Sequence, residues 1–490
     1  MNDTVKAFYE YQKKIFTISS LSSLLSWDQE VNLPVRAADA RGEQLWFVSN
    51  LYQEYVTRPS YMSMVEKLLD LSDSLSVTDR RCVELAKKDI DLYTRFPTWF
   101  VEAYERAKAT SQHVRAEARR TNDFALFIPA LQETFALTKE YGSYLTKTGD
   151  AYDGLLDMFE EWTTRTSYDA LFAPLEDALP KIVQRMASTA DTSLYYNSSV
   201  PSHDLEHFLK ECMRQIGFDF ERGMVATSIH PFFSWVSIHD NRVNTRYDDL
   251  IETIYSTLHE TGHALYEMSS APVFQNSYLR WGASTGVHES QSRLLENIIG
   301  RSRAFVSFLL SRLQKALPGA LQQRTEEGLY TALTQVRPSS IRVRADEVTY
   351  TLHIMVRYVI EKKLFDGSLH IKDIPEAWNS LMQQYVWIVP STDAEGCLQD
   401  IHRSCGYFWY FPTYALGNIA SAQLRNTFVQ ANPTWEDEIV QGDFSWYRAR
   451  FSTHIRSSGR SMTPNDLLLK TTGESLNSSH YLRYLSEKYT

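Results

Sequence analysis

The chain has 490 residues and a formal net charge of −10. This length exceeds the usual size of one hydrophobic core, so we expect two lobes. The negative charge, without a long basic run, argues against nucleic acid or an anionic membrane surface as a partner, and no apolar run approaches the ~18 residues that span a bilayer. The first residues show no secretory signal, and the four scattered cysteines favour a reducing cytoplasm over a disulfide framework.

Residues that break helices are scarce, with 19 glycines and 16 prolines, which predicts a mostly helical fold. The apolar spacing predicts amphipathic helices over 45–55, 62–71, 78–93 and, after a break at 94–97, over 99–121. His113 is the only histidine before residue 200. We therefore interpret the chain as one catalytic unit, 1–490, with a helical scaffold lobe over about 1–200 and a metal-site lobe over about 201–490.

Histidines concentrate in the second part, where eight of the 13 lie between residues 230 and 402. Residues 227–243, rich in serine, aromatic and β-branched side chains, predict a short pair of strands. The helix that follows is expected to begin at Asp248 and Asp249, because Asp is a preferred N-cap and apolar residues then recur near helical spacing. Function is therefore expected in this region and in the helices after it.

The expected helix carries His259-Glu260-Thr261-Gly262-His263, a His-Glu-x-x-His motif. Histidines four residues apart share one helix face and can reach one metal ion, which indicates zinc chemistry on peptides. Glu260 is placed to take a proton from a water molecule on the zinc ion. Such a pair of histidines also arises in helices that bind no metal, so a third ligand decides between the two interpretations.

The segment 286–292 offers the favoured third ligand, Glu289, in the first turn of a second helix that closes at Gly300. An isolated Glu at this position is usually a partner of the helix dipole. Because this Glu follows a His-Glu-x-x-His helix, we favour its interpretation as a metal ligand instead. Cys397, His402 and Cys405 form a weaker candidate cluster, because a fourth ligand is missing.

Motifs along nearly the whole chain resemble the carboxypeptidase Taq family of metallocarboxypeptidases. They occur in the family's order at 27–30, 41–45, 230–232, 259–263, 288–290, 341–346 and 396–402. The chain departs from the family's pattern at four positions, which affects the expected substrate preference rather than the proposed ligands. These positions are Phe233, Asn244, Arg403 and Trp409.

The resemblance implies a large, mostly α-helical zincin with two lobes around a deep cleft, forming a homodimer. It implies a zinc-dependent metallocarboxypeptidase of broad specificity that releases single amino acids from peptides with a free C-terminus. Cobalt would suit the same ligands. The resemblance also suggests His402 and Tyr410 as donors to the oxyanion, although an ordinary buried histidine and a packed aromatic ring are the alternatives.

Recognition of the terminal carboxylate requires a cation, and a planar guanidinium suits a carboxylate. Arg342 matches the family's carboxylate-binding arginine, whereas we interpret Arg344 as a surface charge. Asp240 and Arg242 either shape the same subsite or form a structural ion pair. The same resemblance places His230 among the substrate-binding candidates.

Two other functions stay open from the sequence. An endopeptidase or oligopeptidase on the same scaffold would not need Arg342. A zinc-stabilised interaction protein would need a fourth ligand and no general base, so Glu260 argues against it.

Overall fold

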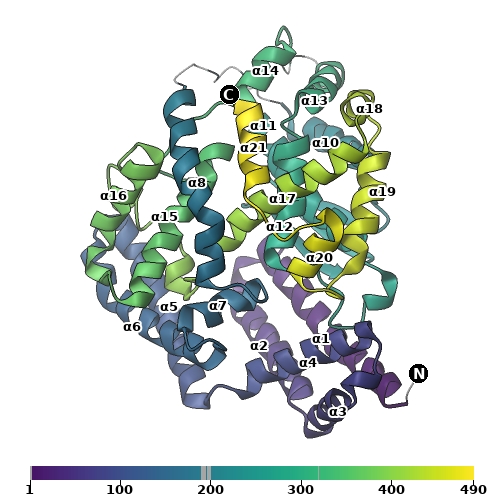
Figure 1. Ribbon diagram of the computed structural model, residues 1–490, viewed down its shortest axis with the longest axis vertical. Helices are drawn as coiled ribbons and strands as arrows, with labels where there is room; N and C mark the ends of the chain where they lie inside the picture. Colours follow the sequence, from purple (N-terminus) through teal and green to yellow (C-terminus); the bar gives the residue numbers. More distant parts are fainter. Residues whose placement is uncertain are drawn as a thin grey trace. The chain divides into compact units, whose positions relative to one another are not determined.

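The computed structural model describes residues 3–188, 192, 195, 200–317, 319 and 321–489. Helices make up nearly all of the regular structure (Figure 1). This confirms the prediction of a mostly α fold. None of the described helices combines the length and the apolar character that crossing a membrane requires.

The described chain divides into two compact units, and each unit is built from three separate segments. Unit 1 comprises Met1–Arg95, Thr192–Tyr330 and Thr427–Gly473, and unit 2 comprises Phe96–Asp191, Thr331–Asn426 and Glu474–Thr490. This division differs from the expected boundary near residue 200, because helices early in the chain pack on elements that follow much later. The description of the whole chain as one catalytic unit with two lobes stays a prediction.

Unit 1 begins with a helical segment whose core is formed by α1, α3 and α4, with Tyr278 and Leu279 packed into it. Its second segment contains a small sheet and the helices around the candidate site, and its third segment adds short helices. The elements are α1 (Asp3–Val31), η1 (Val35–Ala37), α2 (Ala38–Val56), α3 (Pro59–Asp70), η2 (Ser72–Ser74), α4 (Val77–Thr94), α10 (Ser202–Ile216), β1 (Gly223–Thr227), β2 (Phe232–Ser237), β3 (Asp240–Thr245), α11 (Leu250–Met268), η3 (Pro272–Phe274), α12 (Thr285–Arg293), η4 (Leu294–Ile299), α13 (Arg303–Ala316), α18 (Trp435–Gln441), α19 (Ser445–His454), η8 (Arg456–Ser458) and α20 (Pro464–Thr472), with α14 (Glu326–Leu333) at its boundary.

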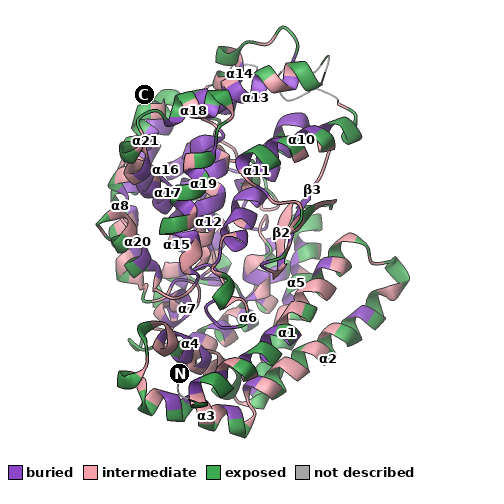
Figure 2. Ribbon diagram, turned by 90° about the vertical axis from the view of Figure 1, so that its right-hand side faces the viewer, coloured by how far each residue is buried: buried purple, intermediate pink, exposed green. Residues whose placement is uncertain are grey.

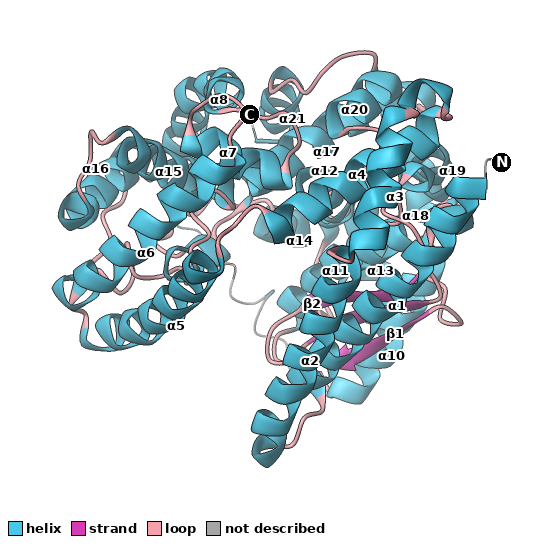
Figure 3. Cartoon of the chain, turned by 90° about the horizontal axis from the view of Figure 1, so that it is seen from below, coloured by secondary structure: helices cyan, strands magenta, loops and turns pink. Residues whose placement is uncertain are grey.

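The three strands form one sheet in the order β1-β3-β2, drawn in magenta in Figure 3. Val243 in the central strand pairs with Val225 in parallel and with Phe233 antiparallel. The predicted strand pair is therefore present as β2 and β3, and β1 adds a third, parallel strand. Val243 also belongs to the cluster of buried residues that includes Ala264 and Met268 of α11, so the sheet supports one face of the helix that carries the His-Glu-x-x-His motif.

Helix α11 is buried along most of its length, whereas α2 exposes most of its residues (Figure 2). The first turn of α11 is capped by Asp249, whose carboxylate accepts a hydrogen bond from the Glu252 backbone N–H at 2.8 Å. Apolar residues on several faces then suit a helix that is surrounded by protein. Asp249 is one of the two adjacent aspartates that the sequence offers as a start signal.

Unit 2 is helical throughout its described residues. Helix α15 is almost entirely buried, and it begins at a cap formed by Asp346, which accepts hydrogen bonds from the Val348 and Thr349 backbone N–H groups. This cap follows η5 directly and so fixes the segment that carries Arg342. The elements are α5 (Thr98–Thr121), α6 (Phe124–Leu145), α7 (Ala151–Phe159), α8 (Arg165–Met186), η5 (Arg342–Arg344), α15 (Glu347–Asp366), η6 (Ile371–Asp373), α16 (Ile374–Val386), η7 (His402–Cys405) and α21 (Ser479–Tyr489), with α17 (Phe411–Ala431) at its boundary.

Candidate active site

Two helices of unit 1 meet at a glycine. A Cβ atom on Gly262 of α11 would lie 2.5 Å from the Gln291 carbonyl oxygen and 2.6 Å from the Ser292 Cα atom, both in α12. The missing side chain therefore lets the two backbones approach closely. This approach brings Glu289 of α12 to the two histidines of α11.

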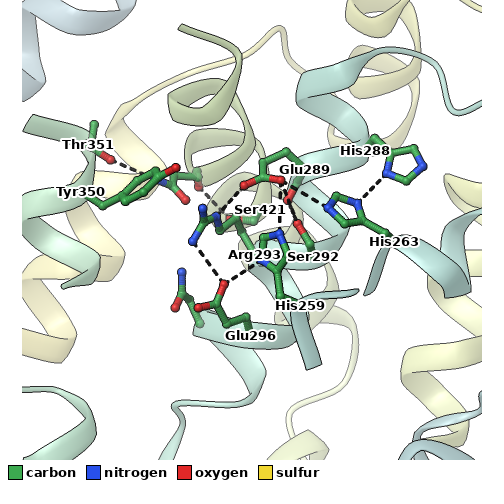
Figure 4. A network of polar contacts seen from close by, with 12 residues as sticks. His259, His263, His288, Glu289, Ser292, Arg293, Glu296, Tyr350, Thr351 and Ser421 are labelled. Atoms are coloured by element: carbon green, nitrogen blue, oxygen red, sulfur yellow. Dashed lines mark hydrogen bonds and ion pairs between the residues drawn. The ribbon is translucent and has the colours of Figure 1, made fainter. Parts of the chain in front are cut away.

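The three predicted ligands are grouped, and they are the only set of His, Cys, Asp or Glu among the described residues with metal-binding geometry. The ligand atoms of His259, His263 and Glu289 all lie within 4.8 Å of one another. Glu289 Oε2 is 3.6 Å from His259 Nε2 and 3.5 Å from His263 Nε2. Figure 4 shows both rings directed toward the carboxylate. Two imidazole nitrogens and one carboxylate are the donor set of a catalytic zinc site.

Glu289 lies one turn deeper in its helix than the sequence suggests. Ser284 caps α12, accepting a hydrogen bond from the Val287 backbone N–H at 3.1 Å, so the helix begins at Thr285. Glu289 is consequently in the second turn, not the first. Beyond Arg293 the helix continues as the π-helical segment η4, which ends before Gly300.

Glu260 is 8% exposed, and within the described part of the chain its carboxylate makes no hydrogen bond or ion pair. Burial raises its pKa to about 7, against the opposing charge of His259. A carboxylate with a pKa near neutrality is suited to accept a proton and to release it again. Its neighbour in sequence, His259, is one of the grouped ligands.

The charges around the ligands oppose the effect of burial. Burial would lower the pKa of His259, but the carboxylates of Glu289 and Glu296 raise it to about 9. Burial would raise the pKa of Glu289, but Arg293 and the two histidines hold it well below its usual range. For His263 burial prevails and lowers the pKa to about 3, so the ring is neutral. Glu289 is therefore anionic and His263 neutral, the forms that bind a cation, whereas His259, whose pKa is raised, has to lose a proton when a metal ion binds.

Two of the proposed ligands, His259 and Glu289, have a charged partner behind them. His259 Nδ1 lies 2.9 Å from Glu296 Oε2 in η4. Arg293 bridges two carboxylates, with its Nε 2.7 Å from Glu289 Oε1 and its Nη1 3.2 Å from Glu296 Oε2. Such partners orient metal ligands.

The comparisons with known proteins agree with this geometry. The family model described as Carboxypeptidase Taq (M32) metallopeptidase matches residues 7–489. The chain belongs to this family. M32 enzymes are metallopeptidases, and the grouped donors of His259, His263 and Glu289 fit a divalent metal ion.

Relatives of this M32 protein are similar over their full length. The chain is 33% identical to Carboxypeptidase 1 of Bacillus subtilis, covering 99% of this chain and 98% of that protein. It is 32% identical to Thermostable carboxypeptidase 1 of Pyrococcus furiosus, covering 100% and 99% respectively. The crystal structure of an M32 carboxypeptidase from Deinococcus radiodurans R1 matches with a TM-score of 0.96 at 33% identity, covering 100% of this chain and 99% of that one. The protein is accordingly a metallocarboxypeptidase, and the helical fold is that of the M32 enzymes.

Arg342 lies in unit 2 and is held from three directions. Its backbone N–H donates to Gln399 Oε1 at 2.8 Å, its Nε donates to Asp400 Oδ1 at 3.1 Å, and its Nη1 donates to the Tyr350 hydroxyl at 3.2 Å. Burial would raise the pKa of Asp400, but the guanidinium groups of Arg357 and Arg342 hold it well below its usual range. These contacts leave Nη2 and one N–H of Nη1 without a protein partner among the described residues.

His402 and Tyr410 lie together in the same unit, with ring centroids 5.6 Å apart and planes 27° from parallel. Burial lowers the pKa of His402 to about 4, and nearby arginines, Arg342 first, act in the same direction. Its Nδ1 atom is buried and has no hydrogen-bond partner among the described residues. The ring is therefore neutral. The weaker cluster of Cys397, His402 and Cys405 is not grouped in metal-binding geometry.

Asp240 and Arg242 form a two-point ion pair in unit 1. The Nε and Nη2 atoms of Arg242 donate to the Asp240 carboxylate, both at 2.8 Å, and its guanidinium lies 4.1 Å from the ring centroid of Trp27. This two-point contact is the geometry of a structural ion pair. His230 is exposed, and its carbonyl oxygen accepts from the Ser228 hydroxyl at 2.6 Å.

Each of the four departures from the family pattern contacts residues of its own unit. Asn244 accepts a hydrogen bond from the Trp27 indole at 2.9 Å, and Phe233 packs against the His263 ring with centroids 6.4 Å apart. In unit 2, Arg403 Nε lies 3.8 Å from Glu361 Oε1. Trp409 is buried, with its ring stacked on Tyr141. Only Phe233 touches a proposed ligand.

Several residues that support the site are not singled out by the sequence argument. Glu267 lies four residues after His263, and Arg293 and Glu296 lie four and seven residues after Glu289. These spacings place each of the three residues on the same helix face as the proposed ligand that precedes it. The signal exists, but charged residues at such spacings are common on solvent-exposed helices, so it is not specific.

Proposed function

We propose that the protein is a zinc-dependent metallocarboxypeptidase of broad specificity that releases single amino acids from peptide C-termini. The observation that supports this most directly is the grouping of His259, His263 and Glu289 within 4.8 Å, beside a buried Glu260. His259, His263 and Glu289 would hold the zinc ion. Cobalt suits the same donors.

A zinc ion at this site supplies Lewis acidity, which polarises the scissile carbonyl and lowers the pKa of water. The protein's own groups move the proton. Glu260, with a pKa of about 7, accepts the proton of the attacking water and transfers it to the leaving amine. The neutral ring of His402 and the hydroxyl of Tyr410 are the proposed donors to the oxyanion.

Arg342 is the proposed anchor of the substrate's terminal carboxylate. Its remaining donors, Nη2 and one N–H of Nη1, form one end of the guanidinium and match two carboxylate oxygens. Arg242 already forms a two-point ion pair with Asp240. Asp240, Arg242 and His230 therefore remain proposals for shaping the substrate-binding surface.

The family resemblance also supports a homodimer that acts on peptides with a free C-terminus, and the four scattered cysteines favour the cytoplasm. No described feature favours nucleic acid as a partner, since the net charge is −10.

The test is a peptide digest followed by mass spectrometry. We expect ladders that shorten one residue at a time from the C-terminus, and loss of cleavage after a chelator removes the metal. The variants His259→Ala, His263→Ala and Glu289→Ala should each lose both zinc, measured by elemental analysis, and cleavage. Internal cuts would instead identify an endopeptidase, and full zinc retention in Glu289→Ala would place the third ligand elsewhere.

A further inference from the structure

The two histidine ligands are supported in different ways. His259 Nδ1 contacts a carboxylate directly, at 2.9 Å from Glu296 Oε2. His263 Nδ1 instead lies 2.6 Å from Nδ1 of another imidazole, His288. On its far side, His288 Nε2 lies 3.0 Å from Glu267 Oε1. His263 is thus connected to a carboxylate through a second ring, as Figure 4 shows for the two rings.

Only one arrangement of protons satisfies this chain of contacts while His263 binds a metal ion. Its Nε2 faces Glu289 and must offer a lone pair to the metal, so the proton of a neutral ring is on Nδ1. His288 must then accept at Nδ1 and carry its own proton on Nε2, which donates to Glu267. Glu267 Oε1 also accepts from the Gly282 backbone N–H at 3.0 Å. Every contact therefore has one donor and one acceptor.

The surroundings hold this chain in place. Glu267 is 1% exposed, and the His288 ring lies between aromatic rings, with centroids 5.1 Å from Tyr266 and 6.2 Å from Phe233. Phe233 is one of the positions at which this sequence departs from the family pattern. The His288 side chain is only 19% exposed and Glu267 is buried, so an unmatched donor or acceptor in this chain is costly and this order of the protons is favoured.

We propose that His288 is a positioning residue that fixes the tautomer and ring orientation of His263, with Glu267 as its anchor. The relay, defined as His263–His288–Glu267, is the counterpart of the direct His259–Glu296 contact. This inference rests on the proposed function, because it takes His263 as a metal ligand. Loss of the relay should weaken metal binding, while the direct support of His259 remains.

The experiment compares His288→Leu with His288→Gln in the full-length protein, measuring the Zn²⁺ dissociation constant by competition with a chelator. Leucine can neither accept from His263 nor donate to Glu267, so we expect affinity to fall roughly 10- to 100-fold, the usual cost of losing such a partner. Glutamine offers a carbonyl oxygen to His263 and an amide N–H to Glu267, so it should recover most of the affinity. The d–d absorption spectrum of the Co²⁺-loaded protein should change in His288→Leu and stay close to wild type in His288→Gln.

Tyr266→Phe is the matched control. It keeps the ring beside His288 but removes the hydroxyl that accepts from the Ala283 backbone N–H at 3.0 Å. It therefore loosens the same loop without touching the relay, and we expect its Zn²⁺ affinity to stay close to wild type. A fall equal to that of His288→Leu would show that the loop, not the relay, is responsible.

Two further variants keep the inference testable if His288→Leu does not fold. Glu267→Gln retains an acceptor for His288 and should bind Zn²⁺ more tightly than Glu267→Leu, whereas equal affinities would overturn the relay. Wild-type affinity in a folded His288→Leu, or equal weakness of His288→Leu and His288→Gln, would also overturn it. Failure of the proposed function is distinct, because His263→Ala itself would then retain its metal.

Discussion

The close approach at Gly262 predicts that a single methyl group disturbs the metal site. In Gly262→Ala the new Cβ would lie 2.5 Å from the Gln291 carbonyl oxygen, whereas ordinary contacts begin at 3.4 Å and real ones rarely fall below 3.0 Å. Helix α12 must therefore move away from α11 by about 0.5 to 0.9 Å, the difference between these distances. Glu289 moves with α12.

Metal binding should weaken whatever the net effect on stability. Ligand distances tolerate changes of only about 0.2 Å, so the displacement takes Glu289 out of position. We expect Zn²⁺ affinity to fall at least about 10-fold, by analogy with the loss of a supporting contact. Stability is subject to two opposing terms, because alanine favours the helix by about 1 kcal/mol and overpacking costs about 1–3 kcal/mol.

Chelator competition measures the Zn²⁺ affinity, and thermal melting of the metal-free protein measures stability. Gly42→Ala is the matched control, since Gly42 also lies within a helix, α2, but a Cβ there would meet nothing within 4 Å. It should be neutral or stabilising by up to about 1 kcal/mol, with unchanged metal affinity. If Gly262→Ala bound Zn²⁺ as tightly as Gly42→Ala does, the close approach would not be what positions Glu289.

Three further predictions concern catalysis, recognition and acid stability. Glu260→Gln should retain Zn²⁺ but lose about 10²- to 10⁴-fold in kcat, because an amide cannot accept the water's proton; near-normal kcat with zinc bound would exclude the base role. Arg342→Ala should lower kcat/KM on free-acid peptides by roughly 30- to 1,000-fold, from about 2–4 kcal/mol of charge-assisted contact, with partial recovery in Arg342→Lys. C-terminally amidated peptides are the control: wild type should cleave them poorly and the variant should lose little more, whereas equal wild-type rates on both forms would indicate an endopeptidase. Arg357 and Arg342 depress the pKa of Asp400. Its ion pairs therefore stabilise the fold at pH values above about 3.9, the pKa of an aspartate in the unfolded chain, and this stabilisation is lost as the pH falls below about 4. Asp400→Asn should therefore melt at a lower temperature at pH 7 and show a shallower decline on acidification, and parallel melting curves would contradict this account.

Local sequence signals predict the helices well. The expected helices at 78–93 and 99–121 correspond to α4 (Val77–Thr94) and α5 (Thr98–Thr121). Ser76 caps the first, and Pro97 precedes the second. Capping residues and apolar spacing are local, so they can be read from the sequence.

Features that depend on distant contacts could not be predicted in the same way. Strand β1 pairs in parallel with β3, and the Trp27 indole donates to Asn244, far along the chain. No local pattern indicates such pairings. The π-helical segment η4, which carries Glu296 to His259, also lacks a recognisable sequence signal. The motifs therefore indicated the proposed ligands, while their supporting partners required the three-dimensional structure.

The interleaving of the units has a consequence for biosynthesis. A growing chain that has reached the end of α13 already contains His259, His263 and Glu289, yet unit 1 still lacks its third segment. In that segment the buried Arg456 donates to Gln291 of α12 at 3.0 Å and also to the Tyr447 hydroxyl. The helix that carries Glu289 thus gains this support only late in translation. We expect a ribosome-bound intermediate to hold its metal ligands loosely, so that hydrolytic activity develops only once nearly the whole polypeptide has been made.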